Sequence, residues 1–165
     1  MTGASAGKIV SDRARLTRQL DQWRSAGRRI VLSNGTFDLL HVGHVRSLED
    51  ARTRGDVLVV GLNTDASVRT YKGPGRPVVP EGERAEIVAA LACVDLVTLF
   101  DEPTAEQLIR LVRPDVWAKG RDYTEETLPE AAVVRELGGD IAIVGDPKDH
   151  AASDLIARIQ ERFAP

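Results

Sequence analysis

Short apolar runs that alternate with amphipathic stretches constrain the fold of this chain more than any other feature of its sequence. Five runs have the length and composition of strands, and the stretches between them carry apolar residues at helical spacing. The run over residues 56–62 is nearly continuous, as expected for a strand that is covered on both faces. This alternation predicts an α/β fold, a doubly wound parallel sheet of about five strands with helices on both faces. The predicted strands cover residues 29–33, 56–62, 95–100, 115–118 and 141–144.

The helices are predicted from the same spacing and from residues that start or stop helices. An extra N-terminal helix follows the N-cap Ser11 and ends at Gly27, and Pro103 lies in the first turn of a later helix. The last helix follows the N-cap Ser153 and buries an apolar stripe. That stripe consists of Leu155, Ile156 and Ile159. The other predicted helices cover residues 43–54, 65–71, 83–93 and 129–137.

Length and composition are those of one globular domain. We expect this domain over residues 28–165, after a leader and helix over residues 1–27 of which residues 1–10 are mobile. Because 42% of the residues are hydrophobic and 28% charged, disordered and membrane proteins are disfavoured. The net charge of −3 argues against nucleic-acid binding as the main task. The single Cys93 excludes an internal disulfide and is expected to be a buried small hydrophobe rather than a reactive thiol. The N-terminus has no apolar signal core, which predicts a cytoplasmic protein with no membrane partner.

Polar residues follow four of the predicted strands. They lie at residues 34–44, 63–65, 119–123 and 145–153. Ligands of parallel sheets bind at the carboxyl ends of the strands, near the switch in strand order, so these segments are predicted to converge on one active site. The sequence contains no GxGxxG after the first strand, no GxxxxGK[ST] loop and no GxSxG elbow. Dinucleotide, P-loop and serine-hydrolase sites with those motifs are therefore disfavoured.

His41 and His44 lie where the first strand leads into a helix. A helix N-terminus presents unpaired N–H groups and the positive end of the dipole, and Gly43 lets a ligand approach the backbone. The pair therefore predicts a phosphate site in which imidazole stabilises charge that grows on a transferring phosphoryl group. The alternatives are two polar residues that only start a helix, or a metal pair, which needs further ligands that the sequence does not obviously supply.

Other charged residues lie in or beside the same segments. Asp38 either bonds its own turn, orients a histidine or holds a metal-bound phosphate. Lys72 and Arg76 are either solvated loop charges or ligands of a substrate phosphate. Arg84 opposes the dipole in the first turn of its helix, although nearby glutamates offset this. Lys119 ends a buried strand, where a cation without an anionic partner is costly, and this favours a functional role.

Two further pairs of residues are open to two interpretations. Asn63 and Asp65 are good residues for a helix start and are also candidates for ligand binding. Arg121 and Asp122 either pair with each other or contribute to the site.

The segment from Gly35 to His44 closely resembles the GxFDxxHxGH signature of the cytidylyltransferase-like nucleotidyltransferases. Further matches extend the resemblance over residues 28–162. They lie at residues 60–67, 72–73, 76–78, 84, 89–91, 94–95, 113–115 and 119–123. The combination is most similar to the heptose 1-phosphate adenylyltransferases, which occur as stand-alone enzymes or as the second domain of a bifunctional one.

This resemblance implies a Rossmann-like fold and transfer of AMP from ATP to a sugar 1-phosphate, which gives an ADP-sugar and pyrophosphate. The acceptor oxygen would attack the α-phosphorus in line, and Mg²⁺ would be held by the ATP phosphates rather than by a protein metal site. The implied catalytic residues are His41, His44 and Lys72. The implied nucleotide-binding residues are Gly35, Thr36, Phe37, Asp38, His41, Gly43, His44, Lys119, Gly120 and Ser153. The implied substrate-binding residues are Asn63, Asp65, Lys72, Arg76, Arg84, Arg121 and Asp122. Related enzymes also suggest a homodimer or a larger homo-oligomer.

Two departures from the family pattern bear on the choice of substrate. Ala151, Ala152 and Ser153 stand where the family usually has Ser-Thr-Thr, so two hydroxyls that could touch the nucleotide are missing. Arg121 stands where the heptose enzymes typically have glycine, and it adds a cation beside the pocket. Two other functions therefore stay open. One is transfer from CTP to glycerol 3-phosphate or a similar polyol or amino-alcohol phosphate, and the other is a nucleotide-binding module that has lost catalysis.

Overall fold

A five-stranded parallel sheet forms the centre of the molecule. The computed structural model describes residues 5–121, 128–146 and 151–163. The strands are β1 (Ile30–Gly35), β2 (Val57–Asn63), β3 (Leu96–Phe100), β4 (Val116–Gly120) and β5 (Asp140–Val144). Their order is β3-β2-β1-β4-β5, so the direction in which strands are added reverses between β1 and β4. The predicted α/β fold is confirmed, and each strand begins and ends within one or two residues of its predicted bounds.

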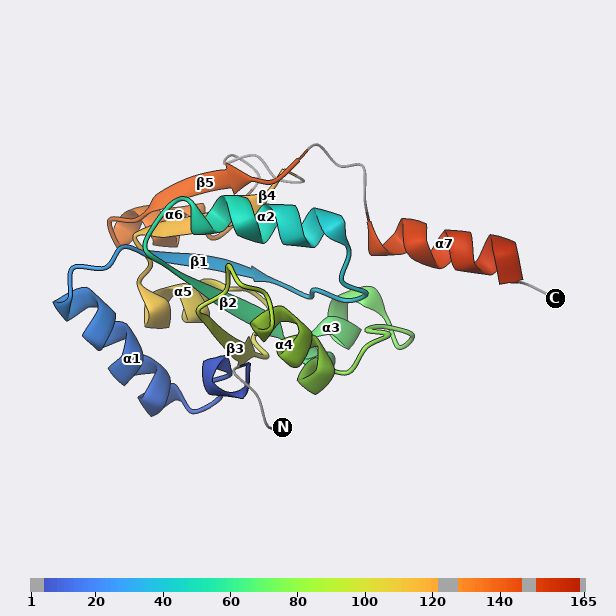
Figure 1. Cartoon of the computed structure of the whole chain (residues 1–165), viewed down its shortest axis with the longest axis horizontal. Coiled ribbons are helices and arrows are strands. Elements are labelled where there is room, and N and C mark those ends of the chain that lie inside the picture. Colours follow the sequence, from blue (N-terminus) through green and yellow to red (C-terminus); the bar gives the residue numbers. More distant parts are fainter. Residues whose placement is uncertain (1–4, 122–127, 147–150, 164–165) are drawn as a thin grey trace.

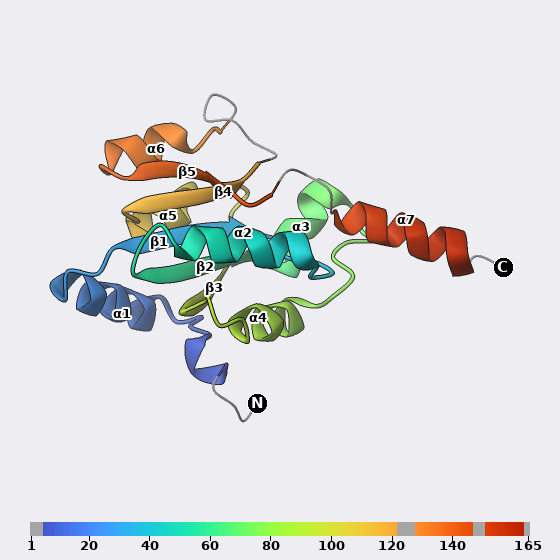
Figure 2. The same ribbon diagram turned by 45° about the horizontal axis from the view of Figure 1, so that its top comes forward.

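Helices cover both faces of the sheet (Figures 1 and 2). One face packs against α1 (Arg13–Ser25), α5 (Glu106–Val112) and α6 (Ala131–Glu136). The other face packs against α2 (Val42–Arg52) and α4 (Glu81–Ala89). The remaining helices are η1 (Ala6–Lys8), α3 (Asp65–Lys72) and α7 (Ala152–Phe163).

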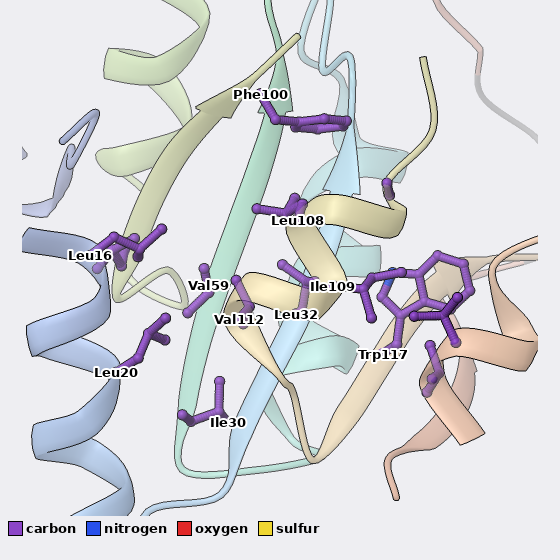
Figure 3. Packing of buried hydrophobic residues seen from close by; sticks show 14 of the residues in the cluster. Leu16, Leu20, Ile30, Leu32, Val59, Phe100, Leu108, Ile109, Val112 and Trp117 are labelled. Carbon is purple, nitrogen blue, oxygen red and sulfur yellow. The ribbon is translucent and has the colours of Figure 1, made fainter. Parts of the chain in front are cut away.

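Residues 30–32 of β1 and nearly all of β2 are apolar because both faces of these segments are buried. In β1, Ile30 and Leu32 belong to the hydrophobic cluster with α1 and α5, whereas Val31 belongs to the opposite cluster. Successive side chains of a strand point to opposite faces, so this alternation is the expected one. Figure 3 shows the first cluster, in which Leu16 of α1 and Trp117 of β4 lie at opposite ends. The nearly continuous apolar run of β2 has the same cause, since each of its residues is buried.

Residues 5–10 are part of this packing, so the prediction of a mobile leader is wrong for them. The Val10 N–H donates to the Val97 carbonyl at 2.9 Å, and Ile9 forms a bridge with Val97 on the edge strand β3. Lys8 donates to the carbonyls of Leu91 and Val94 at 3.2 and 2.7 Å, just beyond the end of α4. The segment therefore covers part of the edge of the sheet, where unpaired strand groups would otherwise be exposed.

Several predicted helix starts are displaced. Asp12 rather than Ser11 caps α1, because its carboxylate accepts from the Arg15 N–H at 2.7 Å. Helix α5 begins at Glu106, so Pro103 lies in the loop before it rather than in its first turn. Gly27 lies beyond the end of α1 with a φ of 68°, in the left-handed region that glycine adopts readily, as the predicted stop requires.

Helix α7 extends away from the rest of the molecule (Figures 1 and 2), and its predicted buried stripe is wrong. None of its residues is buried, and Ile159 is 53% exposed. Ser153 is the second residue of the helix rather than its N-cap. Asp154 instead accepts a hydrogen bond from the Ala151 N–H at 3.1 Å. Periodicity predicted an amphipathic helix correctly, but it cannot show whether a body of protein lies against the apolar side.

Candidate active site

A cleft of about 800 Å³ opens at the carboxyl edge of the sheet, above the switch between β1 and β4. All four polar segments of the sequence contribute to it. The predicted site residues in its lining are Gly35, Thr36, Phe37, Asp38, His41, Gly43, His44, Asn63, Lys72, Arg76, Lys119, Gly120, Arg121 and Ser153. Asp122 lies outside the described residues. The convergence of these segments follows from the parallel topology, which brings the ends of all strands to one edge.

The two histidines form a stacked pair at the N-terminus of α2. His41 is the N-cap residue, and its N–H donates to Nδ1 of His44 at 3.4 Å. The ring centroids are 3.9 Å apart and the planes are inclined by 27°, so both imidazoles lie on the same side of the first turn. The ring of Phe37 lies 5.4 Å from that of His44. Phe37 and Leu39 have φ values of 49° and 50°, so the chain turns through the left-handed region twice before α2.

His44 is neutral at pH 7 in this environment. Burial lowers its pKa to about 4, and the neighbouring charges of His41 and Lys72 act in the same direction, although Asp38 opposes them. A neutral imidazole has one N–H, and Nδ1 of His44 already accepts from the backbone of His41. This contact favours the tautomer with the proton on Nε2. In that tautomer His44 is a donor at the first turn of α2, which suits it to bind phosphate oxygens.

Asp38 fixes the loop that follows α3. Its side chain is only 1% exposed and accepts from the N–H groups of Val78 and Val79 at 3.0 Å and from Arg76 at 2.8 Å. Burial alone would raise the pKa of Asp38, but these hydrogen bonds and the Arg76 charge lower it below its ordinary value. The carboxylate thus binds a distant loop, and the interpretations in which it bonds its own turn or a histidine are wrong. Lys72, the last residue of α3, immediately precedes this loop, and burial together with the Arg76 charge lowers the pKa of its amine.

Arg84 holds three backbone segments together from beneath the cleft. Its side chain is 1% exposed and donates to the carbonyls of Thr36 at 2.5 Å, Val79 at 2.8 Å and Asn63 at 3.0 Å. It also forms a salt bridge of 2.6 Å with Asp65. Neither Arg84 nor Asp65 is in the cleft lining, so their predicted contact with substrate is corrected to the positioning of the loops that carry the site. This buried position also explains why a cation is placed near a helix N-terminus.

Tyr71 connects two further parts of the site, and the sequence analysis missed it. Its hydroxyl lies 2.6 Å from Oγ1 of Thr36 and donates to Oδ1 of Asn63 at 3.4 Å. Asn63 is buried and donates in turn to Oγ of Ser67 in α3. The ends of β1 and β2 are therefore tied to α3 through side chains.

A second group of polar side chains lies above β4. Lys119 Nζ lies 5.0 Å from the centroid of the Trp117 ring, and Trp117 Nε1 donates to Oδ1 of Asn34 at 2.9 Å. Glu130, just before α6, accepts from the Ala105 N–H at 3.1 Å. Burial lowers the pKa of Lys119, whereas the charge of Glu130 opposes this shift. Glu130, which no sequence motif indicates, is thus a carboxylate in the same cleft lining whose charge acts on Lys119.

The loop after β5 is bound to the helix that carries the histidines. The N–H of Gly145 donates to Asp50 of α2 at 2.9 Å, and Arg46 forms a salt bridge of 2.7 Å with Asp146. Arg121 donates from Nε to the Gly145 carbonyl at 2.5 Å, so its side chain bridges the ends of β4 and β5 at the cleft.

Further lining residues were not among the predicted site residues. They are Ser33, Asn34, Ser47, Tyr71, Phe100, Pro103, Thr104, Ala105, Glu130, Val144, Gly145, Asp146, Ala151 and Ala152. Seven of them lie within strands or helices, and the other seven lie in loops between a strand and the next helix. Position after a strand is the signal that could have found this second half. Within residues 5–121, 128–146 and 151–163, no three His, Cys, Asp or Glu side chains are grouped as metal ligands.

A sequence profile of the cytidylyltransferase-like family matches residues 32–159. The chain belongs to this family. Among curated relatives, the bifunctional protein HldE of Methylobacillus flagellatus is 48% identical over 96% of this chain and 32% of its own length. The bifunctional protein HldE of Geotalea uraniireducens is 50% identical over 83% of this chain and 28% of its own length. The chain thus spans about a third of the length of these relatives.

Solved structures agree with the fold of this cytidylyltransferase-like chain. The lipopolysaccharide core biosynthesis protein of Thermoplasma volcanium superposes with a TM-score of 0.63 at 28% identity, over 73% of this chain and all of that one. Pantothenate synthetase of Thermus thermophilus has a TM-score of 0.62 at 20% identity, over 87% of this chain and 63% of its own, which shows a shared fold alone. The family and its relatives confirm the prediction of a nucleotidyltransferase enzyme. Within the described residues, no helix is both long and apolar enough for a membrane span.

Proposed function

We propose that this chain transfers AMP from ATP to a sugar 1-phosphate, specifically a heptose 1-phosphate, and releases pyrophosphate. The observation that carries the proposal is the stacked pair of His41 and His44 at the N-terminus of α2, in a cleft that also contains Lys72. The similarity of residues 72–78 and 119–123 to the heptose enzymes supports a sugar phosphate as acceptor. The relatives named HldE and the lipopolysaccharide core biosynthesis protein point in the same direction.

The reaction needs no nucleophile from the protein. A phosphate oxygen of the acceptor forms the new bond to the α-phosphorus of ATP while the bond to pyrophosphate breaks, so catalysis consists of positioning and charge stabilisation. The neutral His44 donates from Nε2, and the first turn of α2 adds backbone N–H groups. Lys72 adds a cation at the end of α3, and the ion pair of Asp38 and Arg76 fixes the loop that follows it. These groups act where negative charge accumulates on the leaving phosphates.

Mg²⁺, when bound with ATP, would neutralise charge on the triphosphate. The cleft fits an ion that is held by the substrate rather than by the protein. The buried carboxylate of Asp38 is already occupied by Arg76 and two N–H groups, and the described residues contain no cluster of metal ligands. The phosphate oxygens would therefore be its ligands.

Pyrophosphate release tests this function. The assay combines ATP, CTP, GTP or UTP with a panel of sugar 1-phosphates and polyol phosphates, in the presence of Mg²⁺. We expect turnover with ATP and heptose 1-phosphate. Turnover with CTP and glycerol 3-phosphate alone would replace this proposal with a cytidylyltransferase, and binding of ATP without turnover in any combination would leave a nucleotide-binding module.

We also propose that the enzyme is a cytoplasmic homodimer or larger homo-oligomer that uses no nucleic acid or membrane partner. The modest net charge of −3 supports small substrates rather than a polynucleotide. Light scattering on the eluting protein measures the oligomeric state directly, and a monomeric mass at working concentration would contradict this part of the proposal.

A further inference from the structure

The cleft has a second wall, on the sheet face opposite to the histidines. His41 and His44 are carried by α2, which packs on the α2–α4 face. Trp117 belongs to the cluster on the other face, with α5 and α6, and Lys119 lies two residues further along the same strand. Residues i and i+2 of a strand share a face, so Lys119 and the histidines approach the cleft from opposite sides of the sheet edge.

Glu130 lies on this second wall and can accept hydrogen bonds in addition to the one from Ala105. It is partly buried, lines the cleft and precedes α6. One carboxylate oxygen accepts from the Ala105 N–H at 3.1 Å. An ionised carboxylate offers two oxygens and about four acceptor positions, so it can take further hydrogen bonds from a ligand in the cleft.

The chemistry of this wall suits the uncharged part of a substrate. A carboxylate repels phosphate but accepts well from hydroxyl groups, and a charged partner makes such a bond stronger than a neutral one. Phe100, Pro103 and Ala105 add apolar surface beside it, which suits the carbon skeleton of a sugar. Lys119 also lines the cleft from the end of β4 and supplies a cation, so the wall combines acceptor, donor and apolar surface.

The geometry of in-line transfer favours the second wall as the position of the acceptor. In-line transfer requires the attacking and leaving oxygens on opposite sides of the α-phosphorus. With the leaving phosphates over His44 and the N-terminus of α2, the attacking group would approach from the side of the cleft away from α2. The wall that contains Lys119 and Glu130 belongs to the sheet face opposite to α2. We propose that this wall is the acceptor subsite and that Glu130 binds hydroxyl groups of a polyhydroxylated phosphate. This inference rests on the proposed adenylyl transfer.

Steady-state kinetics of Glu130→Gln test the inference. The amide keeps an oxygen that can accept from Ala105 but removes the charge, so the loop before α5 is retained. We expect the KM for heptose 1-phosphate to rise about 10- to 100-fold, as for loss of a hydrogen bond to a charged group, while the KM for ATP changes less than about twofold. Glu136→Gln on the same helix is the matched control, because Glu136 is exposed and pairs only at the surface with Arg110. Its kinetics should equal those of the unmodified enzyme.

Deoxy analogues of the acceptor separate binding by Glu130 from a structural role. In the unmodified enzyme, removal of the hydroxyl that Glu130 binds should lower kcat/KM about 10- to 100-fold, and in Glu130→Gln the same removal should have little further effect. If Glu130 had only a structural role, removal of the hydroxyl would lower kcat/KM by the same factor in Glu130→Gln as in the unmodified enzyme. A rise in the KM for ATP instead of the acceptor would assign Glu130 to the nucleotide and overturn the inference.

The two proposals fail in different ways. If the unmodified enzyme turns over no sugar 1-phosphate, the adenylyl transfer fails and the acceptor subsite with it, before any variant is made. If the unmodified enzyme turns over a sugar 1-phosphate but Glu130→Gln has normal kinetics, only the proposal of the acceptor subsite fails. Should Glu130→Gln not fold, the deoxy series on the unmodified enzyme still decides, because full activity with every monodeoxy analogue would contradict a hydroxyl contact.

Discussion

Replacement of Arg84 by methionine removes the side chain that joins the backbone segments beneath the cleft. Methionine keeps much of the aliphatic stem, so the change deletes the charged head with little loss of volume. Four hydrogen bonds disappear, to the carbonyls of Thr36, Asn63 and Val79 and to the carboxylate of Asp65. Because Arg84 is 1% exposed, water cannot easily replace it.

The expected cost follows from burial. Loss of one partner of a buried ion pair costs about 3–5 kcal/mol, because the remaining charge stays buried without compensation. The Asp65 side chain is 20% exposed and can recover some hydration, so we expect the lower end, about 3 kcal/mol. Since domains are stable by only about 5–15 kcal/mol, this is a large share of the total. The corresponding fall in Tm is about 6–12 °C for a chain of this size.

Urea denaturation followed by circular dichroism measures this loss, and Arg69→Met provides the matched control. Arg69 also pairs with Asp65, but at 3.9 Å and with a side chain that is 55% exposed. Such surface pairs contribute about 0–1 kcal/mol, so Arg69→Met should be nearly neutral. Equal effects of the two variants, or a loss below about 1 kcal/mol for Arg84→Met, would refute the assignment of Arg84 as the buried link between the loops.

Three further changes test other parts of the structure. His44→Ala should lower kcat about 10²- to 10³-fold with an unchanged circular dichroism spectrum, and an NMR titration of the native protein should place the pKa of His44 near 4. Because the pKa of this histidine is about 6.5 in the unfolded chain, its contribution to stability is present above pH 6.5 and is lost as the pH falls towards 4. Gly61→Ala would put a Cβ 2.2 Å from Leu108 and should cost about 1–3 kcal/mol in urea denaturation, whereas Gly75→Ala, with open space around it, should be neutral. Lys8→Met should destabilise by about 1–2 kcal/mol through loss of two carbonyl contacts, and no change would return residues 5–10 to the role of a mobile leader.

The sheet could be predicted from the sequence because its constraints are local. A strand segment that is covered on both faces is apolar, so residues 30–32 of β1 and most of β2 are visible without any knowledge of their neighbours. The parallel connection then places the polar residues after each strand on one edge, and this predicted that His41 and Lys119 line one cleft. Position along the chain was sufficient for both conclusions.

The functions of Arg84 and Glu130 could not be predicted in the same way. The partners of Arg84 lie up to 48 residues away and are mostly backbone carbonyls, which have no signature in the sequence. From the sequence, Arg84 is a cation in an unfavourable position, which suggested substrate contact, whereas the structure shows a buried link. Glu130 precedes a short helix and has no motif, and only the fold brings it into the same cleft lining as Lys119. Apolar periodicity likewise predicted the α7 helix but not its exposure.

The two departures from the family pattern have different structural consequences. The alanines before Ser153 remove hydroxyls at the N-terminus of α7, so contact with a nucleotide there would depend on the backbone and on Ser153. The side chain of Arg121, which stands where the family has glycine, is held at the cleft because its Nε donates a hydrogen bond to the Gly145 carbonyl. Gly145 is in turn bound by Asp50 of α2, and Arg121 helps to lower the pKa of that carboxylate. The arginine is therefore linked, through Gly145 and Asp50, to the helix that carries His44.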